Sequence, residues 1–167
     1  MSMFCYQCEQ TVRGTGCTVA GNCGKDAETA ALQDVLIHAA MSVARVLQKV
    51  RANSARDRDA LREGDHFLLE ALFTTVTNVN FDPARVEQMI RKASPVRERI
   101  RALMGGHGDA CGGAHTGSCL GAWQPAPDRA GLLQQAEALS IAARIQHAGA
   151  EVTGLKELAL YGLKGMA

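Results

Sequence analysis

Four of the six cysteines in this 167-residue chain lie within its first 23 residues, at Cys5, Cys8, Cys17 and Cys23. The surrounding segment, residues 1–25, carries four glycines and shows no apolar periodicity, which is typical of a loop. A loop this polar buries too little apolar surface to become ordered by itself. We therefore expect residues 1–25 to wrap around a group that the cysteine thiols bind.

The charge of the chain is nearly balanced, with 18 Lys and Arg against 17 Asp and Glu and a formal net charge of +1. Basic and acidic residues alternate along the chain and form no basic block, so the charge pattern does not indicate a nucleic-acid partner. No apolar run approaches the roughly 20 residues needed to cross a bilayer, and the N-terminus lacks a basic segment followed by an apolar one. We therefore expect a cytoplasmic protein without a membrane partner.

The cytoplasm keeps most thiols reduced, so a tight cysteine cluster there more often binds metal than forms disulfides. The spacing C-x2-C-x8-C-x5-C fits an iron–sulfur cubane, because the close pair can hold two adjacent irons while the longer intervals pass around the other corners. Glycines also let backbone N–H groups approach the sulfides. A tetrahedral zinc site is the alternative, although such sites usually show two C-x2-C pairs. Disulfide pairing is a third possibility.

The rest of the chain predicts an all-α fold, because apolar residues make up 47% of it, aromatics only 4%, and the apolar positions follow helical spacing. Asp26 is a plausible N-cap for a helix over 27–51. The charged segment 53–65 ends in Gly64 and predicts a solvated connection, with one helical turn as an alternative for part of it. A helix is expected over 65–79, with a strand as the alternative because residues 74–79 are rich in β-branched side chains.

Asp82 and Pro83 predict the start of a third helix that runs to about residue 103, bent or restarted at Pro95. Residues 104–127 hold seven glycines and two prolines and predict one long loop. Asp128 then caps a helix that extends to about Ala143, and a last helix follows Gly149. We expect one helical iron–sulfur domain over 1–167, made of the cluster loop 1–25, helices within 26–103 and 128–167, and the Gly-rich loop 104–127.

Short motifs surround the four cysteines: F-C-x-Q-C at the start, T-G-C-T around Cys17, C-G-K around Cys23 and A-x-L-Q-D from Ala30 to Asp34. With these motifs, MFCYQCEQTVRGTGCTVAGNCGKDAETAALQDVLIHA closely resembles the N-terminus of hybrid cluster proteins, also called prismane proteins or hydroxylamine reductases. Later stretches resemble the same family, namely GDHFLLEALFTTVTNVNFDPARVEQMI, the W-Q-P at 123–125 and the terminal LKELALYGLKGMA. The resemblance covers nearly the whole chain.

The resemblance implies that Cys5, Cys8, Cys17 and Cys23 bind a [4Fe-4S] cluster, since family members with wider spacing carry [2Fe-2S] instead. It also implies a helical domain built as two three-helix bundles. In this family hydroxylamine or nitric oxide is reduced at a second cluster, called the hybrid cluster. His, Glu and Cys residues of two further domains hold that cluster, and the resemblance does not extend to those domains. We therefore expect an electron-transfer domain that works with a redox partner protein and is not catalytic alone. The alternative is a zinc-stabilised helical interaction module, and the oligomeric state is left open.

Other residues of interest include H-x3-C-x3-H-x3-C in the Gly-rich loop, formed by His107, Cys111, His115 and Cys119. A regular helix would align these four, but six glycines between 105 and 117 make a helix unfavourable, so a mobile loop is expected and a second metal site is the alternative. The remaining candidates have structural interpretations. His38 and His66, the latter expected to open the second helix, are packed or solvated, Phe4 and Tyr6 cover the thiols from water, and Trp123 anchors the core.

Overall fold

The computed structural model describes residues 3–8, 10–52, 57–76, 79–104 and 122–167. The described residues form six α-helices and one short 3-10 helix, Val12–Gly14, and they contain no strand beyond an isolated β-bridge. The α-helices are α1 (Ala27–Ala52), α2 (Arg58–Thr74), α3 (Pro83–Ala102), α4 (Arg129–Leu139), α5 (Ile141–Ala148) and α6 (Ala150–Met166). The prediction of an all-α fold with an N-terminal cysteine-rich loop is confirmed.

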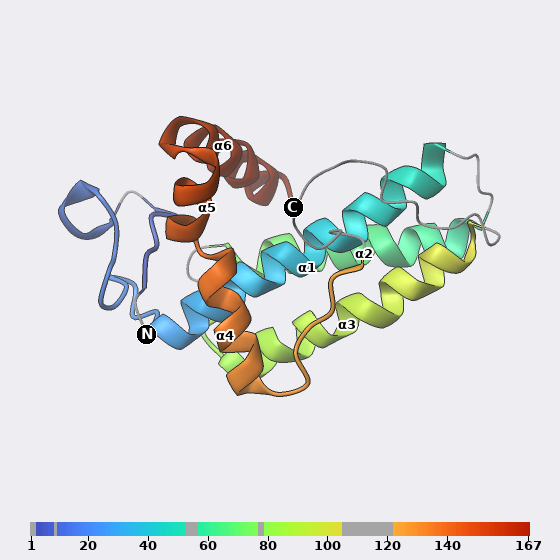
Figure 1. Ribbon diagram of the computed structural model, residues 1–167, viewed down its shortest axis with the longest axis horizontal. Helices are drawn as coiled ribbons and strands as arrows, with labels where there is room; N and C mark the ends of the chain where they lie inside the picture. The colour runs from blue at the N-terminus through green and yellow to red at the C-terminus, as the bar shows by residue number, and fades with distance from the viewer. Residues whose placement is uncertain (1–2, 9, 53–56, 77–78, 105–121) are drawn as a thin grey trace.

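Helix α1 is the centre of the fold, and it packs against α2, α3 and α4 (Figure 1). Helices α1, α2 and α3 contact one another and form a three-helix bundle. The other three helices pack in chain order, with α4 against α5 and α5 against α6, and α6 also lies against α2. The N-terminal loop lies at the end of the bundle where α1 begins, beside α5 (Figure 1).

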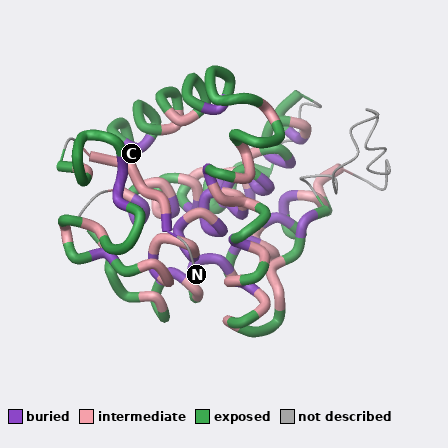
Figure 2. The backbone as a smooth tube through the Cα atoms, turned by 60° about the vertical axis from the view of Figure 1, so that its left-hand side comes forward, coloured by how far each residue is buried: buried purple, intermediate pink, exposed green. Residues whose placement is uncertain are grey.

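The hydrophobic core follows the inner face of α1, as the buried residues along that helix show (Figure 2). Its members on α1 include Leu32, Val35, Leu36, Val43, Val46, Leu47 and Val50, which meet Phe67 and Ala71 from α2 and Val86, Ile90 and Ile100 from α3. By length and composition α1 could cross a membrane, contrary to the sequence expectation, but 67% of its most apolar 18-residue window is buried within the bundle. Burial of this kind is what the core helix of a bundle requires.

Helix α2 begins seven residues earlier than predicted, so the solvated connection expected over 53–65 is wrong from Asp57 onward. The Asp57 side chain caps this helix by accepting hydrogen bonds from the N–H groups of Asp59 and Ala60 at 3.0 and 3.1 Å. Gly64 does not end a segment but lies inside α2, where a Cβ atom would be 2.7 Å from Ile100 Cδ1 and 2.9 Å from Leu47 Cδ1. The helix ends at Thr74, not at residue 79, and His66 is an exposed residue in its middle.

The other helix boundaries also depend on caps. Helix α3 starts at Pro83 after the N-cap Asp82 and ends at Ala102, as predicted, and it continues through Pro95 without restarting. Asp128 caps α4 as predicted, but that helix ends at Leu139 instead of extending to Ala143. Ser140 has an extended backbone conformation and accepts a hydrogen bond from Ala143 N–H at 3.2 Å, which starts the separate helix α5.

Trp123 anchors the core where the chain returns after the Gly-rich loop, as predicted, since it is buried within the main hydrophobic cluster. Its ring packs edge-on against His38 of α1, with ring centroids 5.1 Å apart. Its carbonyl accepts a hydrogen bond from Arg97, a fully buried side chain on α3 that also donates to Ser42 Oγ at 3.3 Å. Contacts from both α1 and α3 therefore fix the chain at Trp123, where it leaves the Gly-rich loop.

Candidate metal centre

The N-terminal loop is folded back on itself by a backbone bridge between two of its cysteines. Cys5 N–H donates to the Cys17 carbonyl at 3.0 Å and Cys17 N–H donates to the Cys5 carbonyl at 2.7 Å, an antiparallel pair. Residues that exchange both hydrogen bonds in this way have Cα atoms roughly 5.5 Å apart and side chains on the same face. Cys5 and Cys17, which are twelve positions apart in the sequence, are therefore neighbours, and Cys17 is buried.

Cys23 lies in a tight turn closed by two backbone hydrogen bonds, Gly21 N–H to the Lys25 carbonyl at 2.8 Å and Gly24 N–H to the Gly21 carbonyl at 2.9 Å. Gly24 has a φ of 91°, which favours glycine. A Cβ atom at Gly21 would lie 2.9 Å from the Cys23 sulfur, so only glycine lets the turn close without moving that thiol. The turn is tied to the first half of the loop by a hydrogen bond from Asn22 Nδ2 to the Gln10 carbonyl.

Two aromatic rings accompany the cysteines, as the sequence predicted. Phe4 and Tyr6 pack edge to face with ring centroids 5.4 Å apart, and both are half-buried. Gly16 makes room for this pair, because a Cβ atom there would lie 2.7 Å from Phe4 Cε2. Burial, and then the negative charge of Glu157, raise the pKa of Tyr6 to about 12, so its phenol stays protonated.

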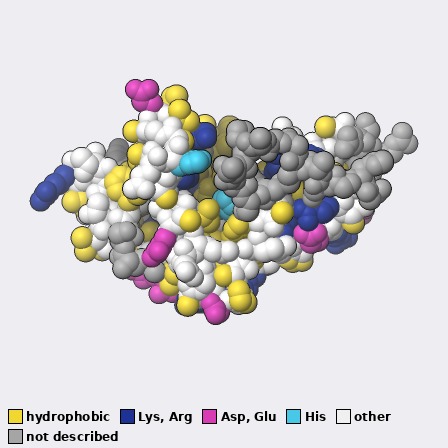
Figure 3. Space-filling model, viewed as in Figure 1, with side chains coloured by type: hydrophobic (Ala, Val, Ile, Leu, Met, Phe, Trp, Pro, Cys, Tyr) yellow, Lys and Arg dark blue, Asp and Glu magenta, His cyan; other side chains and the backbone are white. Residues whose placement is uncertain are grey.

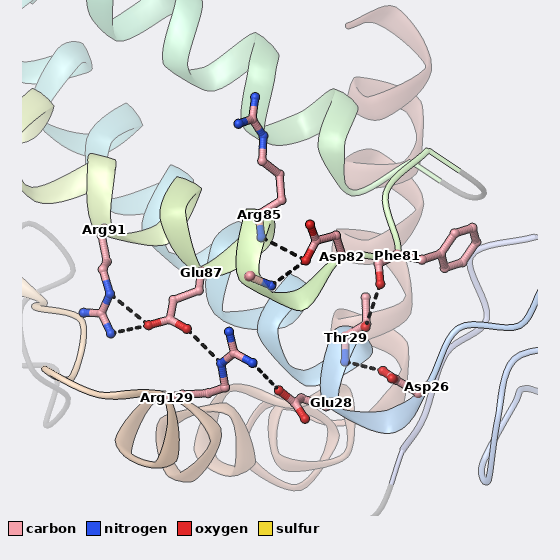
Figure 4. Close-up of polar contacts among 10 residues, drawn as sticks. Asp26, Glu28, Thr29, Phe81, Asp82, Arg85, Glu87, Arg91 and Arg129 are labelled. Atoms are coloured by element: carbon pink, nitrogen blue, oxygen red, sulfur yellow. Dashed lines mark hydrogen bonds and ion pairs between the residues drawn. The ribbon is translucent and has the colours of Figure 1, made fainter.

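The loop leads directly into α1, whose first turn is firmly held (Figure 4). Asp26 caps it by accepting from Thr29 N–H at 2.7 Å. Hydrogen bonding by Thr29, first through its side chain and then through its N–H, lowers the pKa of the Asp26 carboxyl. Arg129 of α4 joins Glu28 of α1, at 3.2 Å, to Glu87 of α3, at 2.8 Å. These ion pairs fix the start of α1 against α3 and α4. The Cys23 turn directly precedes α1, so its C-terminal end is held in position.

The chemistry of these donors fits a metal centre, although a complete ligand set is not assembled. All four thiols are free of disulfides, and three of them, Cys5, Cys8 and Cys23, are partly accessible. Within the part of the chain that the structure describes, no three His, Cys, Asp or Glu side chains converge closely enough to hold a metal ion. The bridge brings together two of the four predicted ligands, so the assignment of all four stays a prediction.

Of the other candidates from the sequence, one is a packing residue, one is exposed, and four lie outside the described residues. His38 packs on Trp123, and burial, followed by the positive charge of Arg144, lowers its pKa to about 4, so it is a neutral core residue as predicted. His66 is exposed on α2. His107, Cys111, His115 and Cys119 lie outside the described residues.

A group of charged residues near the cysteine loop, of which the two lysines are buried and the others half-buried, was missed by the sequence analysis. The group contains Lys25, Asp34 of α1, Arg144 of α5 and Glu157 and Lys164 of α6. Lys164 and Cys8 line the same cavity of about 410 Å³, together with Tyr6, Glu157 and Tyr161. The available signal was a polar residue inside an otherwise apolar pattern, as with Asp34 between Leu32 and Val35 and with Lys164 in the last helix.

The electrostatics of this group reflect its burial. Burial and then the nearby charge of Glu157 raise the pKa of Asp34 to about 7, against the opposing effect of Arg144 and the two lysines. Burial and repulsion from Lys25 lower the pKa of Lys164 to about 8, against the opposing effect of Asp34, Glu157 and Cys5. Cys5, far from Lys164 in the sequence, is therefore close enough in space to influence the charge of Lys164.

Comparison with known proteins supports the resemblance drawn from the motifs. The chain matches the Prismane/CO dehydrogenase family over residues 3–166. It is 50% identical to a hydroxylamine reductase of Rhodospirillum rubrum, over 99% of this chain and 30% of that protein. Hydroxylamine reductases of Burkholderia lata and Methanocella arvoryzae are 47% and 37% identical, over 98% and 99% of this chain and 30% and 29% of their own lengths. The chain thus spans about 30% of the length of these relatives.

Proposed function

The chain belongs to the Prismane/CO dehydrogenase family, and on this premise we propose that its N-terminal loop binds a [4Fe-4S] cluster through Cys5, Cys8, Cys17 and Cys23 and transfers electrons. The single observation that carries the proposal is the backbone bridge between Cys5 and Cys17, at 3.0 and 2.7 Å. It brings thiols from the two halves of the loop to one face, which a cluster ligated at four corners requires. The free state of all four cysteines supports the same assignment.

When bound, the cluster would supply one-electron chemistry, and with four protein ligands it would leave no open iron for a substrate. The chain's own residues have other roles. The four thiolates bind, Gly21 allows the Cys23 sulfur to take its place in the turn, and the rings of Phe4 and Tyr6 limit the access of water. Exclusion of water by such rings is one of the means by which proteins set a reduction potential.

The activity of the full-length relatives enters only as a proposal for this chain. Its relatives are hydroxylamine reductases, and the chain spans about 30% of their length. We assign it the electron-transfer role in such a reductase, in the cytoplasm and with a redox partner protein, and we expect no turnover of hydroxylamine by the chain alone. The reducing conditions of the cytoplasm support this location, because they keep the four thiols available as ligands.

The proposal is tested by analysing iron, zinc and acid-labile sulfide after anaerobic purification. We expect a brown protein with about four irons per chain, as a cubane requires. Cys17→Ser should abolish most of this iron and lower the melting temperature, because metal ligation adds to the free energy of folding. Cys111→Ser serves as the control and should change neither quantity.

Zinc is the alternative occupant, since four cysteines also satisfy a tetrahedral structural site. In that case the chain would be a zinc-stabilised helical interaction module. A colourless protein that keeps one zinc per chain after reconstitution with iron and sulfide would establish this alternative and reject the electron-transfer proposal. Equal losses from Cys17→Ser and Cys111→Ser would show that the ligand set is wrong.

A further inference from the structure

We propose that Lys164 and Lys25 are positioning residues of the thiolate site, whose buried ammonium groups balance the negative charge of the metal-bound cysteines. This inference rests on the proposed function, and it deepens it by naming side chains outside the ligand set that act on the same centre. It follows from the burial of the two lysines, from their contacts and from the charges around them.

Both lysines are buried far more deeply than is usual for this residue type, with 2% of Lys25 and 6% of Lys164 exposed. Lys25 Nζ donates to Gln33 Oε1 at 2.6 Å, and Lys164 Nζ donates to the Thr75 carbonyl at 3.5 Å. These acceptors are neutral. Within the described residues, neither ammonium group has a carboxylate oxygen within 4.0 Å.

The location of the two lysines connects them with the cysteines. Lys164 shares the cavity of about 410 Å³ with Cys8 and Tyr6, so its side chain reaches the underside of the loop. Lys25 follows the Cys23 turn, and its Cβ and the Cys23 sulfur both lie within 3.2 Å of the position that a Gly21 Cβ would take. Lys164 therefore lies near Cys8, while the Lys25 side chain starts beside Cys23 and extends to Gln33 of α1.

The local charges leave a positive surplus. Arg144 pairs with Glu157, so these two residues together add no net charge to the group. Asp34 lies near both lysines and supplies at most one negative charge. Two buried lysines thus share at most one carboxylate, together with the neutral acceptors on Gln33 and Thr75.

A buried charge without an opposite charge is unfavourable in a protein interior. An anionic group close to both lysines removes this cost, and the four thiolates of the predicted centre are such a group. The same attraction favours the reduced state of a bound cluster over the oxidised state, because reduction adds one negative charge beside the two cations. Loss of either ammonium group should therefore lower the reduction potential and weaken metal retention.

The test uses the metal-loaded full chain with Lys164→Met, which keeps an unbranched side chain one atom shorter and removes its charge. The control is Lys156→Met, an exposed lysine on the same helix, and Lys164→Arg keeps the charge at the buried position. We measure the reduction potential by anaerobic dye-mediated titration and the rate of metal loss to a chelator. Circular dichroism checks that each variant is folded, and Lys25→Gln provides an independent neutral variant if Lys164→Met does not fold.

Lys164→Met should shift the redox equilibrium about tenfold toward the oxidised state, which is about 59 mV for one electron, and it should speed metal loss several-fold. Lys156→Met and Lys164→Arg should match the wild type in both measurements. An unchanged potential and an unchanged rate of metal loss in folded Lys164→Met would overturn the inference. If the wild type binds zinc alone, the electron-transfer proposal fails, but the lysine inference is still tested by the rate of zinc loss.

Discussion

The packing of Gly64 gives a prediction whose magnitude can be worked out from the structure. Gly64 lies inside α2 where that helix crosses α1 and α3, and a Cβ atom there would be 2.7 Å from Ile100 Cδ1 and 2.9 Å from Leu47 Cδ1. Both of these side chains are 1% exposed. Neither can turn outward to make room, so Gly64→Ala forces the packed core to shift.

Two effects of opposite sign decide the result. Replacing a helix-interior glycine by alanine stabilises a helix by about 0.8–1 kcal/mol. Inserting a methyl group into a well-packed core costs about 1–3 kcal/mol. Gly162→Ala isolates the first effect, because that glycine is inside α6 and a Cβ atom there has no neighbour within 4 Å. The two variants should therefore differ by about 2 kcal/mol in the free energy of unfolding, which is the midpoint of the packing cost.

The assay is thermal unfolding of both variants and the wild type, followed by circular dichroism. A difference of about 2 kcal/mol corresponds to a difference of about 4–8 °C in melting temperature for a chain of this size. Gly162→Ala should melt above the wild type and Gly64→Ala at or below it. Equal stabilisation by the two substitutions would refute the close packing of α2 against Leu47 and Ile100.

Two further substitutions test the core around the only tryptophan. Arg97→Met should cost about 1–3 kcal/mol, because the buried Trp123 carbonyl loses its hydrogen-bond donor, and urea unfolding monitored by Trp123 fluorescence measures this loss; an unchanged midpoint would contradict it. His38→Gln should flatten the pH dependence of stability between pH 7 and pH 5. The pKa of His38 is lowered to about 4 in the fold, so the unfolded chain binds a proton below about pH 6.5 while the fold does not, and stability is lost as the pH falls. The same slope in wild type and His38→Gln would show that another group is responsible.

The sequence predicts the ends of α1 and α3 well because caps and apolar spacing agree there. Asp26 and Asp82 both accept hydrogen bonds from the first turn of the helix that follows, and the buried stripe continues without interruption. The start of α2 could not be recognised in the same way, because its cap, Asp57, lies in a run of charged residues. Gly64 also suggested the end of a segment, whereas its role is to let three helices approach closely.

The break between α4 and α5 was missed for a related reason. Apolar residues keep helical spacing across it, from Leu139 to Ala143, so periodicity alone predicts one helix. Only the extended backbone at Ser140 and its cap on Ala143 separate the two helices. In the site, the cysteine spacing predicted which thiols could act together, but it could not predict that a backbone bridge pairs Cys5 with Cys17.

The orientation of α6 explains why the charged group escaped prediction and why it matters for the site. On hydrophobic grounds this helix should bury its leucines, yet Leu155 and Leu158 are each 69% exposed and its buried residues are Thr153 and Lys164. Hydrophobic side chains are accordingly visible on the surface over α5 and α6 (Figure 3).

Polar contacts hold α6 in this orientation. Thr153 Oγ1 donates to the Arg144 carbonyl at 3.1 Å, Arg144 pairs with Glu157, and Lys164 donates to the Thr75 carbonyl at 3.5 Å. Burial of apolar area is the main force that orients helices, so turning the polar face inward requires a compensating interaction beyond these contacts. That face meets the underside of the cysteine loop, at the cavity shared by Lys164 and Cys8. An anionic centre held by the loop would supply the compensation, and so the direction in which α6 faces is itself an argument for the proposed thiolate site.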